Sequence, residues 1–232
     1  MEHLGRYLGN VPNGSFILVS YDQFSTGWKF ALEMFKKEVD EGRFGVFVNS
    51  ILPMSKVFYR AQVAGLDMDK YGMKGKLVVI NLFPEHCDKP YIYDVGRVTE
   101  DTLVPKFHAI MEEVETLYDL RNSVGILATI DGLYELLGEQ ALKRFIMATA
   151  IATDRLTKKY SYHTILIEKY EILPKSLHAW LVSMSEYYLL TRGSISDDGY
   201  SETLAILKSP VEGFEPKVYV NKKKSEPWNK GM

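Results

Sequence analysis

Short, continuous runs of apolar residues recur along the chain, each separated from the next by a longer amphipathic stretch. Runs of this kind, rich in valine, isoleucine and phenylalanine, are typical of β-strands buried on both faces of a parallel sheet. The first run, SFILVS, follows Pro12, Asn13 and Gly14, which favour a turn. Five such runs lie at residues 15–20, 44–49, 76–83, 124–130 and 162–168.

The stretches between these runs carry apolar residues at helical spacing. In the first of them Trp28, Leu32 and Phe35 recur at intervals of three to four residues. Gly42 stands where this helix is expected to end. Further helices are expected at about 53–65, 101–122 and 135–158. Because neighbouring parallel strands need a crossover of helix length, this alternation predicts a mostly parallel central sheet with helices on both faces.

The pattern changes beyond residue 186. Short strand-like segments, separated by turn-forming clusters, lie at residues 187–192, 202–208 and 217–221. Such spacing is typical of antiparallel strands added to one edge of a parallel sheet. No repeat or linker separates them from the rest. We therefore expect a single α/β domain over residues 1–221 and a basic C-terminal tail over residues 222–232.

The composition is that of a globular protein, with 46% of the 232 residues hydrophobic and 25% charged. The 28 basic and 30 acidic residues give a formal net charge of −2, so the surface as a whole offers no strong field to attract nucleic acid. The single cysteine, Cys87, excludes a disulfide framework within the chain. No run is long enough to span a membrane and no signal-like segment occurs, so we expect a cytoplasmic protein.

The approach to the first apolar run carries a recognisable order of residues. Leu4 and Leu8-Gly9 precede the segment Val11-Pro12-Asn13-Gly14-Ser15. This order resembles the start of the archaeal KaiC-like and RecA-like ATPases, a branch of the P-loop superfamily. The similarity covers nearly the whole chain, and it continues at residues 45–48, 75–80 and 126–133 and in the closing strands. The resemblance implies a three-layer RecA-like fold.

The phosphate loop of that family is degenerate in this chain. In an ungapped alignment, Phe24 and Thr26 replace two loop glycines, Gly27 replaces the lysine and Trp28 replaces the magnesium-binding hydroxyl. A phosphate cradle needs glycines to turn backbone N–H groups inward, and it needs a lysine on the phosphates. Lys29 is no substitute, because two residues of helix rotate it by about 200°. We expect Phe24 and Trp28 to fill the space of the phosphates, and no nucleotide cofactor to bind.

The other positions where this family places catalytic groups are only partly filled. The turn after the second strand, Asn49-Ser50, has no carboxylate to polarise a water. Asp131 falls at the position of the family's metal-directing (Walker B) aspartate. Because Asp before Gly at a strand end is common turn chemistry, a capping role or a relic is favoured over metal binding there. His86-Cys87-Asp88 has metal-ligand residue types, but no partner pair at zinc-type spacing, so no metal site and no catalytic residue is expected.

The resemblance and the lost loop together imply a non-catalytic RecA-like domain, a pseudo-ATPase, that acts as a scaffold or binds a protein or peptide. RecA-like domains generally self-associate or take up a neighbour's segment along a sheet edge, so a homo-oligomer is also implied. Fifteen tyrosines and eleven phenylalanines supply side chains that are favoured where protein surfaces meet. Two alternatives stay open: a nucleotide-binding ATPase with an unusual phosphate loop, supported by Asp131, and a recombinase-like DNA-binding paralogue, suggested by the basic tail.

Overall fold

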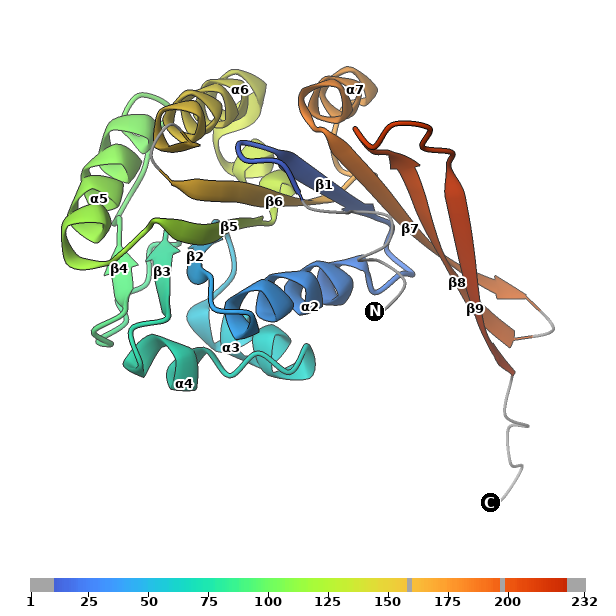
Figure 1. The fold of residues 1–232 in the computed structure, drawn as a ribbon, viewed down its shortest axis with the longest axis horizontal. Helices are drawn as coiled ribbons and strands as arrows, with labels where there is room; N and C mark the ends of the chain where they lie inside the picture. Colours follow the sequence, from blue (N-terminus) through green and yellow to red (C-terminus); the bar gives the residue numbers. More distant parts are fainter. Residues whose placement is uncertain (1–10, 158–159, 197–198, 225–232) are drawn as a thin grey trace.

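Nine strands form one mixed sheet that runs through the molecule (Figure 1). The computed structural model describes residues 11–157, 160–196 and 199–224. The sheet order is β4-β3-β2-β5-β6-β1-β7-β8-β9; the first seven of these pair in parallel, and β8 and β9 are antiparallel. The strands are β1 (Phe16–Tyr21), β2 (Phe44–Asn49), β3 (Leu77–Asn81), β4 (Ile92–Asp94), β5 (Asn122–Ala128), β6 (Ser161–Lys169), β7 (Tyr187–Ser196), β8 (Gly199–Lys208) and β9 (Lys217–Lys224).

Helices cover both faces of the sheet, which confirms the predicted α/β architecture (Figure 1). One face carries α2, α3 and α4, and the other carries α5, α6 and α7. The helices are α2 (Gly27–Asp40), α3 (Met54–Val63), α4 (Met68–Met73), α5 (Leu103–Leu117), α6 (Ile130–Thr157) and α7 (Lys175–Met184). No helix within the described ranges is long and apolar enough to cross a bilayer.

Each face of the sheet has its own hydrophobic core, because successive side chains of a strand point to opposite faces. In β1, Ile17 and Val19 join the core under α2 to α4, whereas Phe16 and Leu18 join the core under α5 to α7. Every residue of β1 is buried. Its continuous apolar run therefore reflects burial on two sides, as the sequence predicts.

The prediction that all the C-terminal strands are antiparallel is wrong for β7. Strand β7 runs parallel to β1, with Ile17 opposite Tyr187. Helix α7, which was not predicted, supplies the crossover between β6 and β7. The antiparallel part of the sheet begins only with β8.

The junction between β5 and α6 also differs from the prediction. The strand ends at Ala128, and Thr129 takes a left-handed backbone conformation with φ of 63°. Helix α6 begins at Ile130, so Asp131 lies in its first turn and does not end the strand. The predicted helix start near residue 135 reflects a second boundary, since Gly138 (φ 83°) interrupts α6.

The predicted boundary between domain and tail lies too early. Strand β9 extends to Lys224, and its residues Lys222 to Lys224 pair with Ser201 to Gly199 of β8. The sheet therefore includes the first three residues assigned to the basic tail. Residues 225–232 lie outside the described part of the chain.

Candidate functional site

The loop between β1 and α2, residues 22–26, lies at the carboxyl ends of the parallel strands. Its strand has β6 on one side and β7 on the other, so the loop sits over the ends of three neighbouring strands. In open α/β sheets, ligands bind at this edge. This loop is therefore the candidate site, and it is also where the sequence analysis expects a degenerate phosphate loop.

Carboxylates of the chain itself occupy the backbone donors of the loop. The N–H and hydroxyl of Thr26 both donate to the carboxylate of Glu202 on β8, with hydroxyl distances of 2.9 and 3.0 Å. The Gln23 N–H donates to Glu171 at 3.0 Å, and the Phe24 N–H donates to Asp22 at 3.1 Å. Three carboxylates thus accept hydrogen bonds from the backbone N–H groups of the loop.

The loop is also bonded to β7 and β8. Both carboxylate oxygens of Asp22 accept from the Gly193 N–H at 3.1 Å, and the Ser25 hydroxyl lies 3.0 Å from that of Thr191. The Tyr200 hydroxyl donates to the carbonyl of Phe24 at 2.8 Å. These contacts come from strands that the sequence places far from the loop. They hold its backbone in a fixed position.

Phe24 does not close the loop with its ring. The residue is 51% exposed, which differs from the expectation that the ring fills the phosphate space. Its main chain makes the close contact instead: a Cβ added to Gly193 would lie 2.3 Å from the Phe24 carbonyl oxygen. The absence of a side chain at Gly193 lets β7 approach the loop this closely.

Gly27, which the sequence analysis aligns with the family's lysine, has no room for any side chain. It is buried at the start of α2, and an added Cβ would lie 2.2 Å from Thr191 Oγ1 and 2.4 Å from Tyr21 Cβ. Both atoms belong to residues of the central strands, so they cannot move aside easily. The glycine is therefore required by packing between α2 and the sheet.

Trp28 packs beside the site under α3. The guanidinium carbon of Arg60 lies 5.2 Å from the centre of the Trp28 ring, which is a cation–π contact. Trp28 lines a cavity of only about 20 Å³, together with residues of β2, β5 and β6 such as Phe47, Ala128 and Ile167. Burial, and to a lesser degree the charge of Asp131, raise the pKa of neighbouring Tyr21 to about 12.

Asp131 is bonded to the backbone of β6. Its Oδ1 accepts from the Lys169 N–H at 3.0 Å, and the residue is 5% exposed. Burial is the main cause that raises its pKa to about 6, and the charges of Glu168 and Glu135 add to it. This contact ties the first turn of α6 to the end of β6, whereas the sequence analysis expected a cap on the segment that follows Asp131. Within residues 11–157, 160–196 and 199–224, no group of three or more ligand-type side chains could hold a metal ion.

Amides and hydroxyls take the place of carboxylates at the ends of β2 and β3. The side-chain amide of Asn49 donates to Asn81 at 2.8 Å. The hydroxyl of Ser50 lies 2.7 Å from that of Thr129. Asn49, which ends β2, and Ser50, which follows it, are both buried and bonded to the chain itself, so neither is available to orient a water.

One polar cluster at this edge was missed by the sequence analysis. Glu168, fully buried at the end of β6, accepts from the Ser20 hydroxyl at 2.5 Å and lies 2.6 Å from His178 Nδ1 on α7. The Tyr188 hydroxyl lies 3.3 Å from the other His178 nitrogen. An acidic residue that ends an otherwise apolar strand run was the available signal. The cluster links α7 to β1, β6 and β7 beside the loop.

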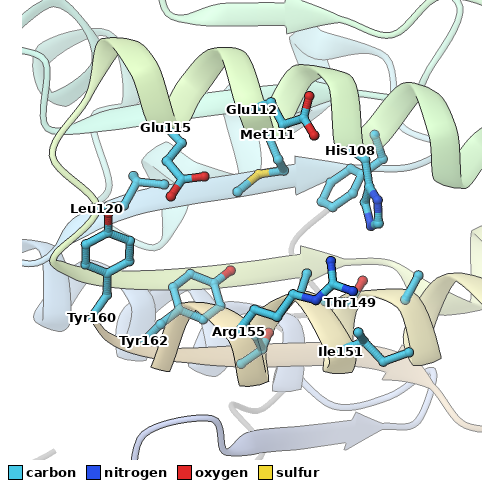
Figure 2. A pocket seen from close by; sticks show the side chains of 14 residues that line it. His108, Met111, Glu112, Glu115, Leu120, Thr149, Ile151, Arg155, Tyr160 and Tyr162 are labelled. Carbon is cyan, nitrogen blue, oxygen red and sulfur yellow. The ribbon is translucent and has the colours of Figure 1, made fainter. Parts of the chain in front are cut away.

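A hollow of about 470 Å³ lies between α5 and α6, away from this edge (Figure 2). His108 from α5 and Arg155 from α6 project into it, and Tyr160 and Tyr162 close its end near the start of β6. His108 is half-buried. The amino ends of the strands lie here, so this hollow is separate from the loop.

Comparisons with known proteins support the fold. No protein-family model and no curated protein matches the chain. Among solved structures, the uncharacterized protein PH0321 of Pyrococcus horikoshii, in complex with an unknown peptide, is similar with a TM-score of 0.77 and 20% identity over 96% of this chain and 98% of that one. The KaiC-like protein PH0186 of the same organism has a TM-score of 0.64 and 14% identity, with 93% and 89% covered. The flagellar accessory protein FlaH of Methanocaldococcus jannaschii has a TM-score of 0.64 and 16% identity, with 94% and 90% covered. The chain therefore has the RecA-like α/β fold of KaiC-like proteins.

Proposed function

From this fold and its altered loop, we propose that the chain is a non-catalytic RecA-like domain, a pseudo-ATPase, that acts in the cytoplasm by binding a protein or peptide. One observation carries the first half of the proposal. The Glu202 carboxylate accepts from both the N–H and the hydroxyl of Thr26, in the part of the loop that would otherwise receive phosphate. The hydrogen-bond donors of Thr26 that could bind an anion are thus taken by a carboxylate of the chain itself.

The charges around the loop oppose a nucleotide as well. An incoming phosphate would have to displace Glu202 from Thr26 and would then lie beside Glu202, Glu171 and Asp22. Two like charges about 4 Å apart repel by about 4 kcal/mol near a protein surface and by about 1 kcal/mol in water. No lysine can offset this repulsion from position 27, because Gly27 has no space for a side chain.

Binding of a protein or peptide is supported by a structural neighbour. PH0321, which matches 96% of this chain, was crystallised with an unknown peptide. The net charge of −2 does not favour nucleic acid as the partner. A homo-oligomer is compatible with the same role, because strand addition and self-association both need surface and backbone groups and no catalytic residue.

ATP turnover tests the proposal. We expect no hydrolysis by the full chain at millimolar ATP and magnesium, and no change from this background in Asp131→Ala. Glu202→Gln removes the charge of the side chain that accepts from Thr26 and so weakens that contact. It supplies neither a lysine nor a magnesium ligand, so we expect the Glu202→Gln chain to stay inactive. Glu112→Gln, at an exposed position on α5, is the matched control. Turnover by the wild-type chain that disappears in Asp131→Ala would overturn the proposal.

A further inference from the structure

Strand β9 forms one edge of the sheet and is long for an edge strand. Its eight residues, Lys217 to Lys224, pair along their whole length with β8. Within the described ranges, no other strand pairs with β9. Alternate N–H and C=O groups of β9 therefore face outward, and an unpaired edge of this kind is a template for another extended chain.

Exposed apolar side chains lie along the same edge. Val218 is 62% exposed and Val220 is 56% exposed. Because side chains alternate, both valines lie on one face of the sheet. Tyr219 lies on the other face and packs against the core with Leu204. The edge combines free backbone groups with two valines that an added strand would cover.

Most of the charge along β9 lies at its C-terminal end. Lys217 begins the strand, Val218 and Val220 follow, and Lys222, Lys223 and Lys224 end it, with no acidic residue in the strand. An antiparallel partner strand would therefore meet the lysines with its first residues and the valines with its later ones. Opposite charges on neighbouring strands stabilise their pairing, and like charges oppose it.

A groove on the α2 side can receive a further side chain of an added strand. It has a volume of about 340 Å³, and Phe30, Leu204 and Tyr219 contribute its apolar walls. Asn221 lines the end of the groove next to the lysines. A bulky residue between two smaller apolar ones would thus point into the groove, while its neighbours cover Val218 and Val220.

We propose that β9 binds an extended segment of a partner protein by strand addition, and that the segment carries acidic residues followed by alternating apolar residues. A second copy of β9 fits less well, because antiparallel pairing would set Lys217 against Lys224. The opposite edge, β4, has only three residues. This inference rests on the proposed binding function and adds to it the surface and the chemistry of the partner.

Fluorescence anisotropy with a labelled peptide tests the inference on the full chain. The probe is Glu-Asp-Glu-Val-Phe-Val with blocked ends, and we expect a dissociation constant below about 1 mM. Two methylated forms of the peptide are compared, one with the odd-numbered and one with the even-numbered backbone nitrogens methylated. Each form loses the N–H donors of one edge of the extended peptide and keeps all its side chains. When the methylated nitrogens are those that face β9, we expect the affinity of the peptide to fall at least about tenfold.

Charge exchange separates binding at β9 from binding elsewhere. Lys222→Glu should weaken the acidic peptide about two- to fivefold, and it should tighten a peptide in which lysines replace the acids. Lys74→Glu, at an exposed position after α4, is the matched control and should change neither affinity. A loss of stability in Lys222→Glu could weaken binding of the acidic peptide, but it could not increase the affinity for the lysine peptide. The increase therefore keeps the test valid.

The outcomes distinguish this inference from the proposed function. Binding that resists N-methylation in both registers, or that Lys74→Glu alters as much as Lys222→Glu, overturns strand addition at β9 but leaves peptide binding in place. The absence of binding at millimolar peptide also overturns the inference. So does a dimer in sedimentation that Lys222→Glu alters and Lys74→Glu does not. ATP turnover, by contrast, overturns the proposed function and not the edge interaction.

Discussion

Replacement of Gly27 by alanine tests whether the lysine position can hold any side chain. The new Cβ would lie 2.2 Å from Thr191 Oγ1 and 2.4 Å from Tyr21 Cβ, so the start of α2 would have to move away from the sheet. Overpacking of this kind costs about 1–3 kcal/mol. Alanine recovers at most about 1 kcal/mol of helix propensity, and less at the first residue of a helix.

We therefore expect Gly27→Ala to lower the free energy of unfolding by about 1–3 kcal/mol, and Gly27→Lys to lower it further without creating ATP binding. In a chain of 232 residues, each 1 kcal/mol corresponds to about 2–4 °C in Tm. Urea unfolding followed by circular dichroism measures the change. Ser55→Ala, at an exposed position in the first turn of α3, is the control and should stay within about 0.5 kcal/mol. A Gly27→Ala chain as stable as wild type would refute the packing argument.

Two further predictions concern the buried polar groups of the same edge. Burial raises the pKa of Asp131 to about 6, so the folded state favours the protonated acid. The stabilisation that this group contributes is therefore present below about pH 4 and is lost as the pH rises to about 6. Unfolding at a series of pH values should show that the wild-type chain loses up to about 3 kcal/mol of unfolding free energy over this window and that Asp131→Asn does not show this loss. An identical pH profile of the wild-type and Asp131→Asn chains would contradict the assignment. His178→Phe removes a partner of the buried Glu168 carboxylate and should cost about 2–3 kcal/mol in urea unfolding, whereas Ser183→Ala on the exposed side of α7 should cost less than about 0.5 kcal/mol. Equal stabilities of these two variants would show that the Glu168 cluster does not hold α7 to the sheet.

The parts of the fold that the sequence predicts well are those with strong local signals. The runs that became β1, β2, β3, β5 and β6 are apolar because both faces of each strand are covered, and such runs are recognisable without knowledge of their neighbours. Helix α7 has only ten residues, and only Leu177 and Leu181 of them are buried, so its helical periodicity is weak and β7 was placed in the wrong direction.

The candidate site could be located but not described from the sequence. The residues that depart from the family's phosphate loop, Phe24, Thr26 and Gly27, are visible as single positions in the β1–α2 loop and at the start of α2. Two of the carboxylates that accept from the loop backbone come from Glu171 and Glu202, which lie 148 and 176 positions from their loop partners. No local pattern relates residues so far apart. Their approach depends on β7 lying beside β1 and β8 beside β7.

The central claim is that the β1–α2 loop, occupied by the chain's own carboxylates, no longer accepts a nucleotide. Isothermal titration calorimetry of the wild-type chain with ATP and magnesium tests it most directly. The account predicts no saturable heat up to millimolar ATP, and the same result without magnesium. A saturable one-to-one isotherm that depends on magnesium would contradict it.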